Sequence, residues 1–360
     1  MAGGKPQAVF ITGEYGIGKT SLARVVRVLE ERSSKLLGFH IMLGTAASLE
    51  DIATKTVQDV LETPDKTGNT IEKIRSLLAE YVGEQSLFGF KIRLDRLRKD
   101  APDISRGYLP FLRSIYQQVS ENYKGLVLVL DEINGMAGKK DLALFLKDLV
   151  DENAVSDHPL PLLLILCGTE ERYRQIIQHH HPVERIFQVP HISPMTGEEM
   201  SEFFERAFGQ VGMCVDGEGM RLLCRYSGGL PKLMHLVGDA AFWIAPENEV
   251  DIQTAMRAII AAAEDVGRKF VDQQVYKALR SKSYQSILRK LARLDFDLVF
   301  KKSDVDHGLS QEERKRLNNF LQRMKKLNVL TSGDEKGEYA FRDRLTRLYL
   351  RMEAMEKGPR

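Results

Sequence analysis

Cysteine, tryptophan and long apolar runs are scarce in this sequence of 360 residues, and each scarcity excludes a class of protein. The three cysteines, Cys167, Cys214 and Cys224, have no metal-type spacing and cannot all pair with one another, so we expect reduced thiols in a cytoplasmic protein. The longest apolar run, residues 160–167, is far shorter than the roughly 18 residues that a membrane-spanning helix requires. No apolar stretch of the signal-peptide type precedes the first predicted strand, so export is not expected.

The overall composition is that of an ordinary globular chain, with 43% hydrophobic and 28% charged residues. This excludes wholesale disorder, and the length predicts two or three domains. The net charge of +2 conceals an asymmetry, because residues 280–360 contain 20 Lys and Arg against 12 Asp and Glu, whereas the rest of the chain contains 32 against 38. A basic tail on an acidic body predicts that the tail meets a polyanion or an acidic partner. The alternative is a solubilising surface.

Short apolar segments alternate with helical patterns in the first half of the chain. Strands are predicted at residues 7–12, 38–43, 126–130 and 162–166. Helices are predicted around the positions Leu22, Val25, Val26 and Leu29, and over residues 49–62, 70–81, 139–151 and much of 84–124, with breaks at 101–102 and 108–110. The alternation predicts an α/β fold with a parallel sheet covered by helices on both faces. The charged helical region 45–124 is either an insertion that touches a partner or a layer that covers the sheet.

From about residue 193 onward the predicted strands stop. Helices are expected at residues 196–209, 217–226, 230–245 and 251–264, and the first begins with the capping-box pair Thr196 and Glu199. The remainder predicts helices at 284–294 and 311–327 and two short strands, at 329–331 and 339–341, joined by a turn. We therefore predict three domains: 1–191, 192–266 and 267–360.

The most specific pattern is the P-loop sequence G-x-x-x-x-G-K-[ST] at residues 13–20. Gly16 and Gly18 allow a tight turn in which successive backbone N–H groups point at phosphate oxygens. Lys19 supplies a positive charge for the β- and γ-phosphates, and the Thr20 hydroxyl can bind Mg²⁺. The sequence therefore predicts that ATP and Mg²⁺ are held by Gly13, Glu14, Tyr15, Gly16, Ile17, Gly18, Lys19, Thr20 and Ser21.

Two carboxylates follow the predicted strand at residues 126–130. In the P-loop scheme Asp131 holds Mg²⁺ through water, and Glu132 polarises the water that attacks the γ-phosphate. The pair favours a hydrolase over a kinase of small metabolites. Thr169, after the strand at 162–166, is expected beside Glu132, where it would orient the water or the γ-phosphate; alternatively it is an ordinary helix cap.

Together these motifs resemble the AAA+ superfamily of P-loop ATPases. More narrowly, they resemble its origin-recognition-type initiators, the related prokaryotic signalling ATPases (STAND-like), and the ATPase subunits of transposition systems. The resemblance covers nearly the whole chain in order: P-loop, acidic strand, polar-ended strand, helical lid and winged-helix-like tail. It implies an Mg²⁺-dependent ATPase that forms a homo-oligomer in the ATP state.

The resemblance also implies roles for three residues. Thr169 falls where the family places its sensor-1 residue. Arg185 lies just before the lid, where the family often presents an arginine finger to a neighbouring subunit; its alternative is a surface ion pair with Glu184 or another acid. Lys232 matches the start of the lid helix that carries sensor 2, although that residue is more usually arginine, which has a bidentate fork that lysine lacks.

The helix predicted at residues 311–327 has two distinct faces. Apolar positions on one face are Leu317, Phe320, Leu321, Met324 and Leu327. The opposite face is basic and polar, and it predicts contact with duplex DNA through Lys315, Asn319, Gln322, Arg323 and Lys326. Additional phosphate contacts are expected from Lys301, Lys302, Arg314 and Lys336. The first functional interpretation is therefore an assembly on DNA controlled by nucleotide. The alternative is a signalling or defence switch whose tail binds protein.

Overall fold

Two compact units make up the chain, and each has its own hydrophobic core. The first unit ends at Ser193 and the second begins at Pro194. The computed structural model describes residues 7–62, 104–295, 297–333 and 335–356. None of the helices within those ranges has the length and apolar character needed to cross a membrane.

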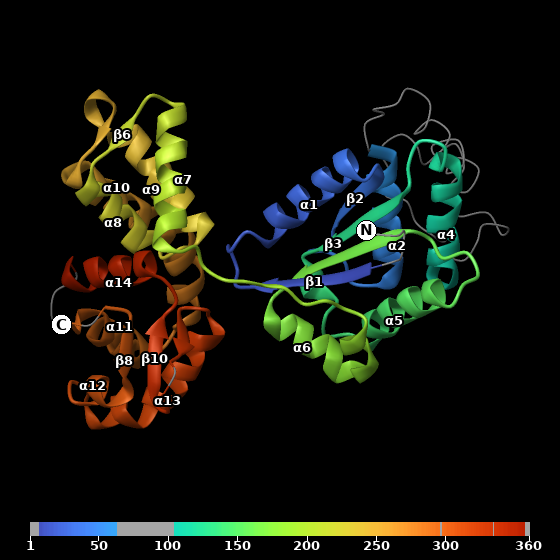
Figure 1. The fold of residues 1–360 in the computed structure, drawn as a ribbon. Helices are drawn as coiled ribbons and strands as arrows, with labels where there is room; N and C mark the ends of the chain where they lie inside the picture. The colour runs from blue at the N-terminus through green and yellow to red at the C-terminus, as the bar shows by residue number, and fades with distance from the viewer. Residues whose placement is uncertain (1–6, 63–103, 296, 334, 357–360) are drawn as a thin grey trace, which may run out of the picture. The chain divides into compact units, whose positions relative to one another are not determined.

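A five-stranded parallel sheet forms the centre of the first unit (Figure 1). Its strands run in the order β2-β3-β4-β1-β5. They are β1 (Gln7–Gly13), β2 (Leu36–Met42), β3 (Gly125–Asp131), β4 (Leu162–Gly168) and β5 (His191–Ile192). The four predicted strands are present and the predicted fold class is confirmed. The two-residue strand β5 is too short to produce a periodic pattern.

Helices cover both faces of this sheet, and successive residues of β3 point to opposite faces. Leu128 and Leu130 belong to the larger core, which also receives side chains from four helices, whereas Val127 and Val129 face the smaller core under α1. The helix on the smaller side is α1 (Lys19–Ser33). Those on the larger side are α2 (Leu49–Glu62), α4 (Ile104–Val119), α5 (Lys140–Ala154) and α6 (Glu170–His179).

The described parts of region 45–124 form a layer that covers the sheet. Both α2 and α4 contribute fully buried side chains, such as Ile52 and Leu112, to the larger core. The helix predicted at 70–81 and the break predicted at 101–102 lie outside the described residues. The break predicted at 108–110 is displaced: the non-helical residue is Gly107, and the helix continues through Pro110. Proline is tolerated there because it falls in the first turn after the kink, where its missing N–H has no helical acceptor.

Helix α1 contacts the sheet through a different face from the one its apolar spacing suggests. Ala23 is fully buried in the smaller core and Val26 packs against that core. Leu22, Val25 and Leu29 are 40%, 53% and 56% exposed. The small side chain of Ala23 lets the helix backbone approach the strands, and the larger residues on the opposite side are left outward.

The second unit begins with a helical region. Its elements are α7 (Gly197–Gln210), β6 (Cys214–Val215), α8 (Gly217–Ser227), α9 (Pro231–Ile244), β7 (Glu249–Val250) and α10 (Ile252–Val266). The four predicted helices are present, and the Thr196–Glu199 capping box forms in both directions. The expectation that strands stop at 193 is wrong in one detail, because β6 and β7 pair as a small parallel ladder. Each has only two residues, so no alternation was visible in the sequence.

The remaining elements alternate short strands and helices. They are the π-helix η7 (Gly267–Tyr276), α11 (Lys282–Arg293), β8 (Val299–Lys301), α12 (Lys302–Asp306), α13 (Gln311–Lys326), β9 (Leu330–Ser332), β10 (Glu338–Phe341) and α14 (Arg344–Glu356). The helices predicted at 284–294 and 311–327 and the two predicted strands are present. A third strand, β8, joins them in an antiparallel sheet of order β8-β10-β9. Elements β8, η7, α12 and α14 were not predicted from the sequence.

One hydrophobic core runs through the whole second unit. It includes Ala263 of α10, Val271 of η7 and Leu345 of α14, among many others. The Tyr349 hydroxyl adds a polar contact by donating to the Asp272 carboxylate at 3.0 Å. The predicted boundary between a lid and a tail domain at residue 267 therefore crosses a shared core, and the division into those two parts remains a prediction.

Glu313 is a buried carboxylate in this unit. It accepts hydrogen bonds from Ser286 Oγ and Lys290 Nζ, both at 2.7 Å, and from the Ser310 N–H at 2.8 Å. Burial alone would raise its pKa, but the bonds from Lys290, Ser286 and Ser310 outweigh burial and lower the pKa to about 2. Because the folded pKa lies below the unfolded one, the stabilisation is complete above about pH 4.5 and is lost as the pH falls toward 2.

We expect Glu313→Gln to lower the free energy of unfolding by roughly 2–3 kcal/mol at pH 7, with a difference from the parent that shrinks below about pH 4. Urea unfolding followed by the fluorescence of Trp243, the single tryptophan, reports on this unit. Glu312→Gln, on the exposed side of the same helix, is the matched control and should have little effect. A difference between Glu313→Gln and the parent that stays constant from pH 7 to pH 3 would contradict the ion-pair explanation.

Candidate functional site

The carboxyl ends of three neighbouring strands converge at one edge of the sheet. In the register, Thr12 of β1 lies beside Gly168 of β4, and Leu130 of β3 lies beside Leu166 of β4. The residues that follow these strands are therefore brought together, namely the loop from Gly13, the pair Asp131 and Glu132, and Thr169. Ligands of open α/β sheets bind at this edge.

The loop after β1 turns through two glycines that have positive φ angles. Gly16 and Gly18 adopt φ angles of 83° and 99°, in the region that favours glycine. Ile17 is buried and anchors the loop, whereas Tyr15 is 67% exposed. Helix α1 begins directly afterwards at Lys19, so its N-terminal N–H groups add a positive dipole end.

The Lys19 side chain folds back onto the start of the loop. Its Nζ atom donates to the carbonyl oxygens of Gly13, at 3.1 Å, and Glu14, at 2.5 Å. Thr20 and Ser21 follow in the first turn of α1 and are exposed. The structure thus gathers all the residues of the predicted phosphate site in one loop and one helix turn.

Asp131 is the most buried polar side chain of the site, with 2% exposure. One of its oxygens, Oδ1, accepts from the Glu132 N–H at 2.8 Å, and the other, Oδ2, lies 3.1 Å from His40 Nε2. Burial raises the pKa of Asp131, but hydrogen bonds from His40, Thr20 and the Glu132 N–H more than offset it, so that the pKa lies below its usual range. Asp131 is therefore ionised at neutral pH.

His40 is a site residue that the sequence analysis missed. It lies on β2, whose residue Met42 pairs with Asp131 in the register. Because an ionised carboxylate only accepts hydrogen bonds, Nε2 of His40 carries the proton in this contact. The signal in the sequence was a single imidazole within an otherwise apolar strand.

Glu132 stands at the sheet edge in a strained conformation. Its φ and ψ are 55° and 47°, in the left-handed region that a residue with a side chain seldom adopts. Its carboxylate lies against Gly44, where a Cβ atom would overlap Oε2 of Glu132. The side chain is exposed and can reach a water molecule at this edge.

Thr169 follows β4 and caps α6, because its hydroxyl oxygen accepts from the Arg172 N–H at 3.4 Å. The helix-cap interpretation is thus realised, and this bond does not use the hydroxyl proton. Cys167, two residues earlier on β4, is buried. Burial raises the pKa of its thiol, which therefore remains neutral. All three cysteines are free.

Arg185 and Lys232 lie in other parts of the chain. Arg185 ends the short helix η5 (His181–Arg185) and is exposed, and within the described ranges no acid pairs with it. Lys232 is the second residue of α9 in the second unit and is also exposed. Their roles next to a nucleotide remain predictions.

The residues at the sheet edge fit a magnesium ion. Mg²⁺ prefers oxygen ligands and is usually held by one or two protein groups together with phosphates and water. The Thr20 hydroxyl and the Asp131 carboxylate supply such oxygens, and the Thr20 hydroxyl is among the groups that lower the pKa of Asp131. Among the described residues there is no cluster of three or more histidine, cysteine or acidic side chains that could bind a metal alone.

The parallel sheet and the residues at its carboxyl edge are those of a P-loop ATPase fold. Similar solved structures support this fold assignment. A Walker-type ATPase of Pyrococcus abyssi is 20% identical, with a TM-score of 0.60 over 96% of this chain and 91% of its own. The ORC2 protein of Aeropyrum pernix, solved as ADPNP and ADP complexes, is 15% identical, with a TM-score of 0.60 over 98% of this chain and 87% of its own. Its ADP form is 13% identical, with a TM-score of 0.51 over the same shares.

At these identities the similarity shows the fold, and the expected resemblance to origin-recognition-type ATPases is confirmed at that level. Neither the protein-family models nor the curated proteins include a match to this chain.

We expect His40→Phe, which keeps a ring but removes the N–H to Asp131, to weaken nucleotide binding about tenfold or more when Mg²⁺ is present and to change it little without Mg²⁺. Outer hydrogen-bond partners of metal ligands typically change metal affinity 10–100-fold. Titration of a fluorescent ATP analogue at several Mg²⁺ concentrations measures this. His40→Gln, whose amide N–H can take the place of Nε2–H, should recover most of the affinity. An equal loss with and without Mg²⁺ would assign His40 a packing role instead.

Proposed function

We propose that the protein binds and hydrolyses ATP in an Mg²⁺-dependent reaction at the carboxyl edge of its sheet. The observation that carries this proposal is the convergence of Lys19 in the P-loop with Asp131 and Glu132 at the end of β3. The fold that the chain shares with a Walker-type ATPase and with the ORC2 protein, which was solved as ADPNP and ADP complexes, supports it.

Each residue has a separable task in this proposal. The N–H groups of the loop and the Lys19 ammonium bind the phosphates, and Thr20 with Asp131 binds the metal ion. When bound, Mg²⁺ neutralises charge that develops on the transferred phosphoryl group. Glu132 accepts a proton from the attacking water, and its fixed backbone directs the carboxylate toward that water.

We expect Glu132→Gln to bind ATP as well as the parent does and to hydrolyse it 10²–10⁴-fold more slowly, because the amide keeps the shape of the side chain but cannot accept the proton. Single-turnover hydrolysis and nucleotide titration separate the two quantities. Glu171→Gln, an exposed glutamate of α6, is the matched control. Hydrolysis by Glu132→Gln at the parent rate would refute the role of Glu132 as general base.

We also propose that the nucleotide state controls assembly. Arg185 is exposed at the end of η5, and in this proposal it contacts the nucleotide of a second copy of the chain. Lys232, at the exposed start of α9, would contact the γ-phosphate from the helical lid. Both side chains are cationic, so each would be attracted to the negatively charged γ-phosphate and would distinguish ATP from ADP.

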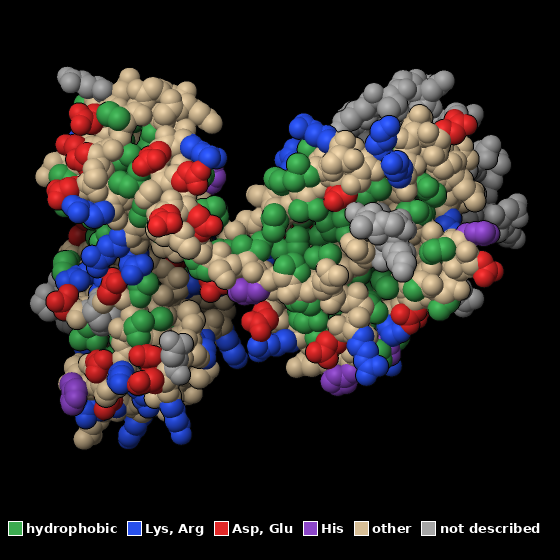
Figure 2. All heavy atoms as spheres, viewed as in Figure 1, with side chains coloured by type: hydrophobic (Ala, Val, Ile, Leu, Met, Phe, Trp, Pro, Cys, Tyr) green, Lys and Arg blue, Asp and Glu red, His purple; other side chains and the backbone are tan. Residues whose placement is uncertain are grey.

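DNA binding is proposed for the end of the second unit that carries α12 and α13. Elements α11, β8, α12, α13, β9 and β10 follow one another in the order of a winged helix-turn-helix. On α13 the predicted apolar residues are buried except for the half-buried Leu327, and the predicted polar face is exposed at Lys315, Asn319, Gln322, Arg323 and Lys326. Figure 2 shows Lys and Arg side chains gathered at this end of the unit.

Two of the additional phosphate contacts expected from sequence already have partners. Lys301 Nζ pairs with Glu335 Oε2 at 2.9 Å, and Arg314 Nε donates to the Asp306 carbonyl at 3.1 Å. Contact with DNA would have to compete with these bonds. The five exposed residues of α13 are therefore the stronger part of the proposed interface.

We expect the triple variant Lys315→Gln, Arg323→Gln and Lys326→Gln to bind duplex DNA at least about tenfold more weakly at low salt and to show a salt slope smaller by about 3, because each phosphate contact contributes roughly 0.9 to that slope. Fluorescence anisotropy with the full chain measures both. The full chain is required because a fragment from residue 270 would cut the shared core. The matched control, Arg206→Gln, Arg221→Gln and Lys269→Gln, removes three exposed cations from other helices of the unit.

A signalling or defence switch is the second candidate, and one observation favours it. The tail packs on the helical region through the continuous core, including the bond between Tyr349 and Asp272. In a switch of this kind the tail contacts the lid or a partner protein rather than DNA. Equal DNA binding by the α13 variant and its control, or no DNA binding by the parent at low salt, would favour this candidate.

A further inference from the structure

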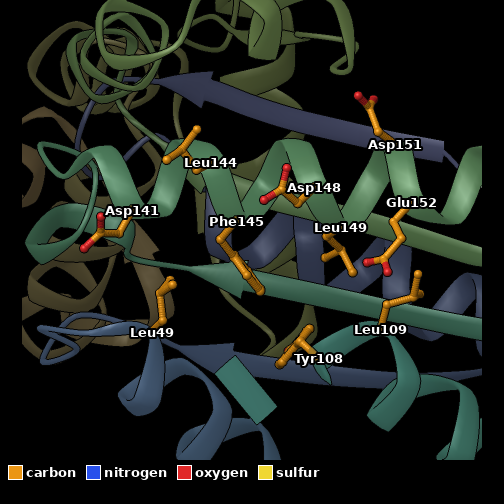
Figure 3. Close-up of a pocket in the computed structure, with 10 residues that line it drawn as sticks. All are labelled: Leu49, Tyr108, Leu109, Asp141, Leu144, Phe145, Asp148, Leu149, Asp151 and Glu152. Atoms are coloured by element: carbon orange, nitrogen blue, oxygen red, sulfur yellow. The ribbon is translucent and has the colours of Figure 1, made fainter. Parts of the chain in front are cut away.

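A groove lies in the first unit between α5 on one side and α2 and α4 on the other, and none of the residues assigned to the P-loop site lines it (Figure 3). Its volume is about 600 Å³. It is lined by Leu49, Tyr108, Leu109, Asp141, Leu144, Phe145, Asp148, Leu149, Asp151 and Glu152. Apolar side chains and carboxylates thus occupy the same depression.

The floor of the groove is apolar and fixed. Leu109 and Leu149 are buried at its base, and the rings of Phe145 and Tyr108 pack edge to face with centroids 5.1 Å apart. The Tyr108 hydroxyl bonds to Thr56 Oγ1 at 2.8 Å inside the unit, so its polar atom is already satisfied. Tyr108 therefore contributes its aromatic ring to the groove, because its hydroxyl is already hydrogen-bonded to Thr56.

The wall formed by α5 carries four carboxylates. Asp151 pairs with Lys147 of its own helix. Asp141, Asp148 and Glu152 are exposed, and within the described ranges no cation pairs with them. The wall therefore has three negative charges that the described part of the unit leaves uncompensated.

The spacing of these three acids matches one face of a helix. Asp148 follows Asp141 by seven residues, and Glu152 follows Asp148 by four. On a helix these intervals are about 10.5 Å and 6 Å along the axis, close to two turns and one turn. A second helix lying along α5 presents side chains at the same intervals, because it has the same rise per residue.

We propose that this groove docks an amphipathic basic helix of a partner protein. The partner places apolar side chains on the floor of the groove, and its Lys or Arg residues, at four- and seven-residue spacing, meet Glu152, Asp148 and Asp141. Helix-in-groove recognition uses this combination of apolar anchors and flanking charges. The same carboxylates would repel nucleic acid or an anionic lipid surface.

The test uses a synthetic helical peptide, blocked at both ends and labelled, with Leu along one face and Arg at the spacing of the three acids. We expect it to bind the full chain in fluorescence anisotropy, with affinity that falls as salt rises. Replacement of either its Arg residues by Gln or its Leu residues by Ser should reduce binding at least about tenfold. The two peptides separate the charged contribution from the apolar one.

On the protein side, the triple variant Asp141→Asn, Asp148→Asn and Glu152→Gln should bind the peptide at least about tenfold more weakly, since three charge pairs are removed. Leu49→Ser, at the edge of the floor, should also weaken binding. The control, Asp157→Asn, Glu171→Gln and Glu205→Gln, makes the same change of charge outside the groove and should stay within about twofold of the parent. ATP hydrolysis should be unchanged in the groove variants, so failure of this proposal is distinguishable from failure of the ATPase proposal.

Two results would overturn the proposal. The first is equal weakening in the groove triple and in the control triple, which would mean attraction to an acidic surface in general. The second is no binding of the peptide to the parent chain at low salt.

Discussion

The functional edge of the first unit depends on the position of one buried carboxylate. Asp131 ends a strand with neighbours on both sides: Asp131 itself pairs with Met42 of β2, and the preceding residue, Leu130, pairs with Leu166 of β4. Its side chain is then held at both oxygens, by His40 from β2 and by the next N–H along the chain. A charge of this kind is stable in a nearly dry place only because each oxygen has a donor.

The same geometry explains why Glu132 behaves differently from its neighbour. One residue beyond the strand the chain turns sharply, and Glu132 takes the left-handed conformation that this turn requires. Its side chain is consequently exposed while that of Asp131 is buried. The backbone thus gives the two adjacent carboxylates separate environments, which suit the proposed roles of a fixed metal ligand for Asp131 and an accessible base for Glu132.

The sequence predicted those parts of the fold and site whose signals are local. The P-loop and the pair after β3 are short consecutive patterns, and the central strands are apolar runs that a parallel sheet requires. His40 could not be predicted, because its contact with Asp131 depends on the register between two strands distant along the chain. The short elements β6, β7, β8 and α12 contain too few residues for periodicity. The sequence also did not predict which face of α1 is exposed, because that depends on how the helix packs on the sheet. The face that carries the small residue Ala23 packs on the sheet, and the face with the larger apolar residues is exposed.

The contacts of Lys19 reduce the conformational entropy that its side chain would lose on binding phosphate. A lysine side chain has four rotatable carbons, and ordering it usually costs about 2 kcal/mol of conformational entropy. Here the carbonyls of Gly13 and Glu14 already restrict the ammonium. That entropy is lost when the chain folds. When an anion binds, the Lys19 ammonium exchanges two neutral carbonyl acceptors for a charged one. The two carbonyls thus preorganise the Lys19 ammonium.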